Sequence, residues 1–251
     1  MPSLPEPSPD AKAHSQQVQD HLRADIAAQG GWITFARYMA LALYAPGLGY
    51  YAAGSAKFGP AGDFTTAPER STLFGRCVAR QVAQVLGETG GDILEAGAGS
   101  GKLACDVLAE LEKLGMLPEQ YLILELSGEL KARQHATLAA HTPHLLDKVQ
   151  WLDQLPQIFS GVMLGNEVLD AMPVHLVVCK DGAWLERVVS VHEAGFSWQD
   201  RPIADSALLQ AAQALDVPDN YLTEINLAAP AFISSLAERL QRGALLMIDY
   251  G

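Results

Sequence analysis

The sequence predicts an α/β protein built on a doubly wound, mostly parallel sheet, with an N-terminal helical and loop extension and a β-hairpin insertion. Three observations predict this class. Short apolar runs alternate with helical stretches through the middle of the chain, as in βαβ units. A glycine-rich turn follows the first of these runs and leads into a helix. Further on, the hydrophobic pattern changes to a period of two around Asp181-Gly182, which is typical of an antiparallel hairpin.

Composition and charge exclude several classes of protein. The 251 residues are 49% hydrophobic and 18% charged, which is the balance of a folded globular protein and not of a disordered chain or a coiled coil. The formal net charge is −12, so the chain repels nucleic acid and anionic lipid, and we expect neither as a partner. No apolar run approaches the ~18 residues that insert across a bilayer, and the N-terminus lacks a secretory leader pattern.

The cysteines and histidines indicate a reducing compartment and no metal site. Cys77, Cys105 and Cys179 are far apart and form no C-x-x-C pair, so neither a disulfide framework nor a zinc site is expected. The histidines at positions 135, 141 and 144 have spacings that match no metal motif. We therefore predict a cytoplasmic protein without a bound metal.

The N-terminal extension begins with a tail and two helices. Residues 1–10 are rich in proline and predict a disordered tail, and residues 11–88 form the extension proper. Apolar residues four positions apart predict a helix over 11–29, which a pair of glycines ends. A second helix is predicted over 34–43, with Thr34 as its N-cap.

A change of composition marks the rest of the extension. Residues 44–68 are dense in glycine, proline and aromatic residues, which predicts a long ordered loop and not a regular element. Loops of this length are often functional, although a plain connector fits the pattern equally well. A helix over 71–86 follows the loop.

Residues 89–251 are predicted to form the doubly wound domain. The hairpin belongs to an insertion over about 172–200, because its antiparallel pattern interrupts the parallel one. Helices are expected to separate the first three of the parallel strands, as in βαβ units. The helices are predicted near 101–114, 128–140, 205–215 and 227–242, and the parallel strands in the apolar runs at 93–94, 121–124, 149–151, 161–164 and 244–248.

The glycine-rich turn after the first strand is the sharpest functional signal. It reads Glu95-Ala-Gly-Ala-Gly-Ser-Gly101, and its glycines let a ligand lie against bare backbone at a helix N-terminus. A dinucleotide site uses G-x-G-x-x-G, whereas E-x-G-x-G-x-G is the signature of class I S-adenosylmethionine-dependent methyltransferases, which are Rossmann-like. The Glu95 carboxylate suits the cationic end of that cofactor. The cofactor-binding residues predicted here are Glu95, Gly97, Ala98, Gly99 and Gly101.

An acidic residue at the end of the next strand predicts a contact to ribose. Glu125 lies 24 positions after Gly101, near the ~20-residue offset of a ribose-binding carboxylate. Dehydrogenases share this geometry, and a solvated strand-end carboxylate would look the same. The adenine is expected beside the third strand, where Trp151 is also compatible with plain core. The further predicted cofactor contacts are Leu126, Trp151 and Leu152.

Polar residues after the fourth strand are predicted to face the methyl acceptor. Asn166, Glu167 and Asp170 follow that strand at the edge where ligands bind in a doubly wound sheet, so we predict all three as catalytic and Asn166 also as a cofactor contact. Two carboxylates can hold a guanidinium and leave one of its nitrogens aimed at the methyl carbon. The alternative is that these residues only cap a helix.

Several segments together resemble the MidA family of methyltransferases. They are Tyr38–Tyr51, Gly62–Glu69 with Phe74-Gly75, Glu95–Gly101, Gly165–Pro173 and Ile248–Gly251, and the likeness runs from about Trp32 to the C-terminus. The family has bacterial and mitochondrial members, and the mitochondrial ones assist assembly of respiratory complex I. The resemblance implies a class I fold, S-adenosyl-L-methionine as cofactor, and a protein substrate, namely an arginine in a complex I subunit.

The resemblance also implies a role for the Gly62–Glu69 segment, a hallmark of the family. We expect this loop to fold over the cofactor or substrate, with Asp63 as a candidate catalytic residue. Family members continue well beyond the Ile248–Gly251 motif, so the sequence is expected to be truncated at its C-terminus relative to them. An unpaired sheet edge left by such a truncation favours a homodimer.

Two other functions stay open on the sequence. An NAD(P)-dependent oxidoreductase would use a related fold, although the glycine spacing and the lack of an evident hydride-transfer acid disfavour it. A noncatalytic assembly factor would retain the fold and bind a partner protein. Covalent catalysis is not expected, because the sequence has no G-x-S-x-G elbow and its cysteines lack a local activating context.

Overall fold

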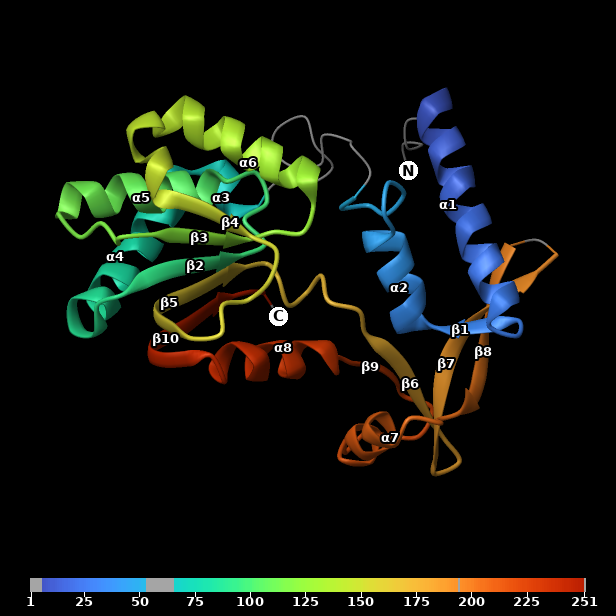
Figure 1. Ribbon diagram of the computed structural model, residues 1–251. Coiled ribbons are helices and arrows are strands. Elements are labelled where there is room, and N and C mark those ends of the chain that lie inside the picture. The colour runs from blue at the N-terminus through green and yellow to red at the C-terminus, as the bar shows by residue number, and fades with distance from the viewer. Residues whose placement is uncertain (1–5, 53–65, 194, 251) are drawn as a thin grey trace. The chain divides into compact units, whose positions relative to one another are not determined.

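The chain forms two compact units, each with its own five-stranded sheet, in a computed structural model that describes residues 6–52, 66–193 and 195–250 (Figure 1). The parallel unit comprises residues 55–171 and 231–251. The antiparallel unit comprises residues 1–54 and 172–230. The segment that interrupts the parallel unit is therefore longer than the predicted insertion over about 172–200.

The sheet of the parallel unit has the order β10-β5-β2-β3-β4, and each neighbouring pair of strands is parallel. The strand order reverses between β2 and β5, which is the switch point beside which open α/β sheets bind ligands. The sheet confirms the predicted fold class. Its strands are β2 (Asp92–Ala96), β3 (Tyr121–Leu124), β4 (Val149–Leu152), β5 (Phe159–Asn166) and β10 (Leu240–Ile248).

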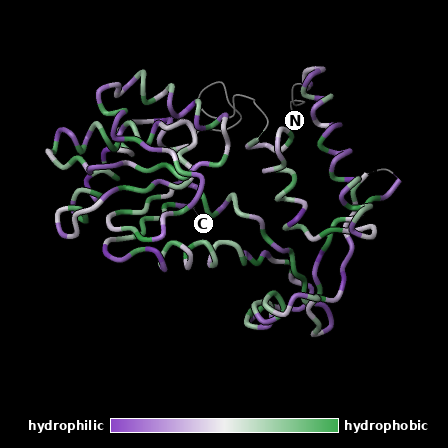
Figure 2. The backbone as a smooth tube through the Cα atoms, viewed as in Figure 1, coloured by the Kyte–Doolittle hydropathy of each residue, from purple (hydrophilic) through white to green (hydrophobic). Residues whose placement is uncertain are grey.

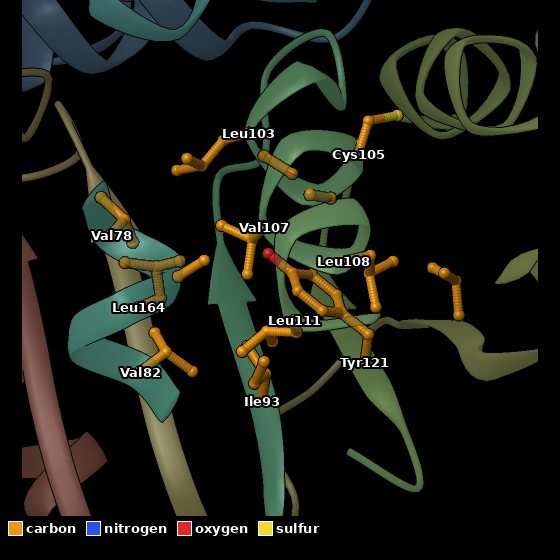
Figure 3. Close-up of a cluster of buried hydrophobic side chains, with 14 of the residues drawn as sticks. Val78, Val82, Ile93, Leu103, Cys105, Val107, Leu108, Leu111, Tyr121 and Leu164 are labelled. Atoms are coloured by element: carbon orange, nitrogen blue, oxygen red, sulfur yellow. The ribbon is translucent and has the colours of Figure 1, made fainter. Parts of the chain in front are cut away.

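Helices cover both faces of this sheet (Figure 1). On one face, buried side chains of these helices and of the strands form a cluster that includes Tyr121, which is fully buried (Figure 3). On the other face, Leu94 and Met163 pack with Leu236. Ile93 and Leu94 point to opposite clusters, as the pleat of a strand requires. The helices are α3 (Ala67–Arg70), α4 (Thr72–Thr89), α5 (Lys102–Leu114), α6 (Gly128–His141), the 3-10 helix η1 (Pro143–Lys148) and α8 (Ala228–Ala237), which begins in the antiparallel unit.

The antiparallel unit pairs the start of the chain with the inserted segment. Its sheet has the order β1-β7-β6-β9, with β8 beside β7. The predicted hairpin joins β6 and β7, and Asp181 and Gly182 have φ angles of +50° and +75°, as a tight hairpin turn needs. The elements are α1 (Pro9–Ala28), β1 (Trp32–Thr34), α2 (Phe35–Tyr44), β6 (His175–Lys180), β7 (Ala183–His192), β8 (Gly195–Pro202), α7 (Ser206–Gln213) and β9 (Leu222–Ile225).

The second N-terminal helix begins as its sequence predicts, whereas α1 begins at Pro9, two residues inside the predicted disordered tail, because Ser8 caps it. The hydroxyl of Thr34 accepts a hydrogen bond of 3.1 Å from the backbone N–H of Arg37 and so caps α2. In α1 the buried residues are Leu22 and Ile26, and most of the helix is hydrophilic (Figure 2). Among the residues that the structure describes, no helix is both long and apolar enough to cross a membrane.

Long-range pairing explains where the structure departs from the predicted elements. The predicted helix over 227–242 is wrong at its end, because α8 stops at Ala237 and β10 begins at Leu240, opposite Phe159 of β5. The local pattern also misses β1, β8 and β9, since each forms only by pairing with a distant strand. Hydrogen bonding to a neighbouring strand overrides local propensity at these places.

Candidate functional site

The carboxyl ends of the parallel strands bring the predicted site segments to one edge of the sheet. Ala96 at the end of β2 is paired with Leu124 of β3 and with Gly165 of β5, and Leu124 is paired with Leu152 of β4. The residues that follow these strands therefore lie in a row. This edge is the candidate site.

The glycine-rich turn enters α5 through left-handed backbone conformations. Gly99 has a φ angle of +54° and Gly101 one of +83°. Gly101 is also the N-cap of α5, and a Cβ on it would lie 3.0 Å from the Cα of Gln134 in α6. Glycine is needed there for its conformation and for the close approach of two helices. The turn leaves the N-terminus of α5 at the carboxyl edge of the sheet, where backbone N–H groups can meet a ligand.

Glu95 lies in the core beneath this turn. Its side chain is on the same face of the sheet as Ile93, it is 2% exposed, and it accepts a hydrogen bond of 2.7 Å from the Tyr121 hydroxyl. Burial raises the pKa of Glu95 to about 7, and the bond from Tyr121 opposes that rise. Its contact with the cationic end of the cofactor stays a prediction, since the partner that the structure gives it is Tyr121.

Glu125 follows β3 and is 9% exposed. One of its carboxylate oxygens accepts a hydrogen bond of 2.9 Å from the backbone N–H of Ser127, and the other accepts one of 3.0 Å from the side-chain amide of Gln134. A carboxylate has about four acceptor positions. Both oxygens are therefore held in place and each keeps capacity for a further donor, such as a ribose hydroxyl.

Gln134 of α6 is a site residue that the sequence prediction misses. It is fully buried and donates a second hydrogen bond, of 3.1 Å, to the backbone carbonyl of Gly99. Its own amide oxygen accepts a bond of 2.9 Å from the indole N–H of Trp151. One side chain thus connects the ends of three strands. The helical pattern of α6 shows only that position 134 is on its inner face, so no local signal marks this role.

The cofactor contacts predicted beyond Glu125 differ in exposure and direction, and two of them, Trp151 and Leu152, are the residues predicted to flank the adenine. Leu126 is 77% exposed at the end of β3. Trp151 is half-buried on the face that α6 covers, and its ring lies 5.6 Å from that of His135. Leu152 packs on the opposite face of the sheet, because neighbouring residues of a strand alternate. The cofactor contacts of all three stay predictions.

The loop after β5 is tied to the end of β10. Asn166 ends β5, and Glu167 follows it with a φ angle of +53°. The backbone N–H of Glu167 donates to the carbonyl of Ile248 at 2.8 Å. Asp170 is exposed, and one of its carboxylate oxygens accepts a bond of 2.6 Å from the Tyr250 hydroxyl. The three predicted acceptor-site residues therefore share one short segment at the carboxyl edge.

Asp249 and Tyr250 are further residues at this edge to which the sequence assigns no role. The Asp249 carboxylate accepts bonds of 3.0 Å and 3.4 Å from the backbone N–H groups of Leu169 and Asp170. The hydrogen bond to Asp170 is the largest of the effects that raise the pKa of Tyr250 to about 12. The Ile248–Gly251 motif is the signal that could have found them, because it follows a parallel strand.

Asp63, which is predicted to be catalytic, lies outside the described residues. Glu69, at the end of the same family segment, accepts a hydrogen bond from the Ser100 hydroxyl in the glycine-rich turn. This contact brings α3 to the turn. Within the described ranges, no cluster of three or more His, Cys, Asp or Glu side chains is arranged to hold a metal ion.

Comparisons with known proteins support a methyltransferase. A family model described as "Putative S-adenosyl-L-methionine-dependent methyltransferase" matches residues 77–251. A Drosophila melanogaster protein named protein arginine methyltransferase NDUFAF7 homolog, mitochondrial, is 32% identical over 98% of this chain and 63% of its own length. The Danio rerio protein arginine methyltransferase NDUFAF7, mitochondrial, is 28% identical over 94% of this chain and 62% of its own length.

Two crystal structures from Burkholderia thailandensis share the fold. One is bound to S-adenosyl-homocysteine, is 49% identical, and matches with a TM-score of 0.94 over 99% of this chain and 66% of its own. The other, a native structure, is also 49% identical, with a TM-score of 0.90 over 99% of this chain and 65% of its own. The chain thus spans about three fifths of the curated relatives and two thirds of these structures. The likeness confirms the predicted class I methyltransferase fold, and the matched family depends on the predicted cofactor.

Proposed function

The chain belongs to this family of S-adenosyl-L-methionine-dependent methyltransferases, as its motifs predict, and on that premise we propose that it methylates an arginine side chain of a protein. The observation that carries the proposal is the Glu125 carboxylate, held by Ser127 and Gln134 beside the glycine-rich turn. This geometry fits a nucleoside, because both carboxylate oxygens keep acceptor capacity for ribose hydroxyls. The arginine acceptor is supported by the names of the curated relatives.

Different residues along the sheet edge would bind different parts of the cofactor. Glu125 would accept the ribose hydroxyls, and Leu126, Trp151 and Leu152 would flank the adenine. The glycine-rich turn would hold the amino acid part, with Glu95 below it. When bound, S-adenosyl-L-methionine supplies an electrophilic methyl group on a positively charged sulfur. These assignments place the methyl group toward the segment that follows β5.

The segment after β5 would hold and deprotonate the acceptor. Two carboxylates, Glu167 and Asp170, would bind a guanidinium and localise its positive charge, while the Asn166 amide donates to the Glu167 carboxylate at 3.4 Å. The free guanidinium nitrogen forms the new bond to the methyl carbon, the carbon–sulfur bond breaks with its electron pair left on sulfur, and a carboxylate takes the proton that the nitrogen loses. No covalent enzyme intermediate is needed.

The resemblance to the MidA family supports a finer proposal about the substrate and the compartment. By that resemblance the substrate protein would be a subunit of respiratory complex I. The cysteine pattern supports a cytoplasmic location.

Titration calorimetry tests the cofactor part of the proposal. S-adenosyl-L-methionine and S-adenosyl-homocysteine should bind the chain, and Glu125→Ala should abolish or strongly weaken that binding. Glu88→Ala is the matched control, because it removes an exposed carboxylate at the other end of the parallel unit, near the start of β2. Binding of NAD alone would overturn the proposal in favour of an oxidoreductase.

Methyl transfer to protein tests the acceptor. The chain is incubated with a bacterial lysate and S-adenosyl-L-methionine labelled on its methyl group, and the labelled protein is hydrolysed to amino acids. We expect label in methylarginine, and Asp170→Asn should reduce it while leaving S-adenosyl-homocysteine binding unchanged. Label in methyllysine alone would contradict the arginine assignment.

A further inference from the structure

We propose that Gln134 is a positioning residue of the nucleoside site. Its side-chain amide is hydrogen-bonded to the glycine-rich turn, to the carboxylate proposed to bind ribose and to the third parallel strand, and so fixes these three segments relative to one another. The inference rests on the proposed function, since it assumes that Glu125 meets ribose. Gln134 would not contact the cofactor itself, but its hydrogen bonds would fix the positions of the Glu125 carboxylate and the Gly99 carbonyl.

The hydrogen bonds of Gln134 leave one orientation for its amide. The indole N–H of Trp151 is a donor only, so the atom of Gln134 that faces it at 2.9 Å must be the amide oxygen. The amide nitrogen then faces the Gly99 carbonyl at 3.1 Å and a carboxylate oxygen of Glu125 at 3.0 Å, and both of these are acceptors. Two donors and one acceptor are thus matched to three partners, one from each of three segments.

Burial makes these bonds strong and their loss costly. Gln134 is fully buried, and Glu125 is 9% exposed. A hydrogen bond to a charged group is stronger than one between neutral groups, and a buried polar group left without a partner destabilises the fold more than an exposed one. A Cβ on Gly101 would lie 3.0 Å from the Gln134 Cα, so α6 packs closely against the turn at this residue.

In the described structure the Gln134 amide is hydrogen-bonded to one charged group, the Glu125 carboxylate, and to two neutral groups, the Gly99 carbonyl and the Trp151 indole. From the same helix, Lys131 pairs with Asp153, and the His135 ring packs against Trp151. A neutral amide therefore suits this position, because its N–H can donate to the Glu125 carboxylate at every pH. A carboxylic acid side chain could donate only while it is protonated.

The test compares Gln134→Met and Gln134→Glu with the native chain by calorimetric titration of S-adenosyl-homocysteine. Methionine keeps the size of the side chain and removes its hydrogen bonds. We expect affinity to fall about ten- to hundredfold, the loss of one charge-assisted hydrogen bond, while circular dichroism shows a folded chain. Gln84→Met, at an exposed position of α4, is the matched control and should bind normally.

The pH profile of Gln134→Glu separates positioning from plain stability. At low pH the new carboxyl is protonated and its single O–H can donate to Glu125, although not also to the Gly99 carbonyl, so binding should be closer to that of the native chain than at high pH. As pH rises the new carboxyl ionises and repels Glu125, so affinity should fall with pH by about tenfold or more relative to the native chain. This result is readable even if Gln134→Met does not fold.

The outcomes distinguish the inference from the function on which it rests. If the native chain does not bind S-adenosyl-homocysteine, the proposed function fails. If the native chain binds S-adenosyl-homocysteine and both variants bind it as tightly as the native chain at every pH, Gln134 has no positioning role and the proposed function stands. Variants that are less stable but bind with native affinity when folded would also overturn the inference.

Discussion

The hydroxyl of Tyr121 donates a hydrogen bond of 2.7 Å to the carboxylate of Glu95 inside the core of the parallel unit. Both side chains are buried, and burial is the main cause that raises the pKa of each, that of Glu95 to about 7. Glu95 is thus the acidic residue of the glycine motif and at the same time a core residue. Its protonation couples the stability of the unit to pH.

Glu95→Gln should remove a pH dependence of stability. The folded-state pKa of Glu95, about 7, lies above its ordinary value of 4.5, so the folded chain binds the proton more tightly. The unfolding free energy of the native chain should therefore fall as pH rises from about 4.5 to 7, at about 1.4 kcal/mol per pH unit at most. Urea unfolding at several pH values measures this. Parallel profiles for the native chain and the variant would contradict it.

Tyr121→Phe provides the second arm of this measurement. Its hydrogen bond lowers the pKa of Glu95, in opposition to burial. Removing the hydroxyl should raise that pKa further, so the pH range in which stability is lost should extend to higher pH. An unchanged range would mean that the bond does not act on the Glu95 charge.

Alanine substitutions at two glycines of the turn should differ in cost. A left-handed conformation costs a residue with a side chain about 1–2 kcal/mol. Gly99 has that conformation, with open space where a Cβ would stand, whereas a Cβ on Gly101 would lie 3.0 Å from the Gln134 Cα. We expect Gly101→Ala to lower the unfolding free energy more than Gly99→Ala in urea titrations. Equal losses would show that α6 moves away freely.

Asp170→Asn should lower the pKa of Tyr250. Tyr250 donates to Asp170 at 2.6 Å, and this bond is the main cause that raises the tyrosine pKa to about 12. Without the carboxylate, the pKa should move toward the ordinary value of 10.0. NMR of tyrosine labelled at the Cζ carbon, followed from pH 9 to 11, detects the shift. A Tyr250 signal that titrates identically in both chains would exclude the contact in solution.

Asp200→Asn should destabilise the antiparallel unit at neutral pH. Hydrogen bonds from Arg187, and then from Lys180, hold the pKa of Asp200 at about 2, below its ordinary 3.8. The ion pairs therefore stabilise the fold above pH 3.8, and the benefit is lost as pH falls through about 2. We expect a loss of about 1–2 kcal/mol at pH 7, after allowance for solvent screening.

The control for that prediction is Asp216→Asn, at an exposed position of the same unit. Chemical unfolding at pH 7 and pH 3 compares the two variants. Asp216→Asn should cost little at either pH, and the deficit of Asp200→Asn should shrink at pH 3. A deficit that does not depend on pH would point to packing and not to charge.

The local sequence pattern was sufficient to predict the features that depend on hydrophobic periodicity and on the spacing of residues along the chain. Alternating strands and helices predicted the parallel sheet, and the position of Glu125 after a strand predicted that it lies at the ligand edge. Asp181-Gly182 predicted its hairpin because two positive φ angles are required at that turn. These features follow from short stretches of chain, whose backbone geometry is set by neighbouring residues.

Tertiary contacts decided which of the site residues form hydrogen bonds with one another. The sequence by itself determined the fold class, the glycine-rich turn and the row of polar residues that follow the parallel strands. Only the folded chain places Gln134 between Gly99, Glu125 and Trp151, turns Glu95 into the core toward Tyr121, and joins Asp170 to Tyr250 across 80 positions. The physical reason is that a hydrogen bond depends on distance in space, and no local periodicity encodes which distant side chains the packing of helices on a sheet brings within 3 Å.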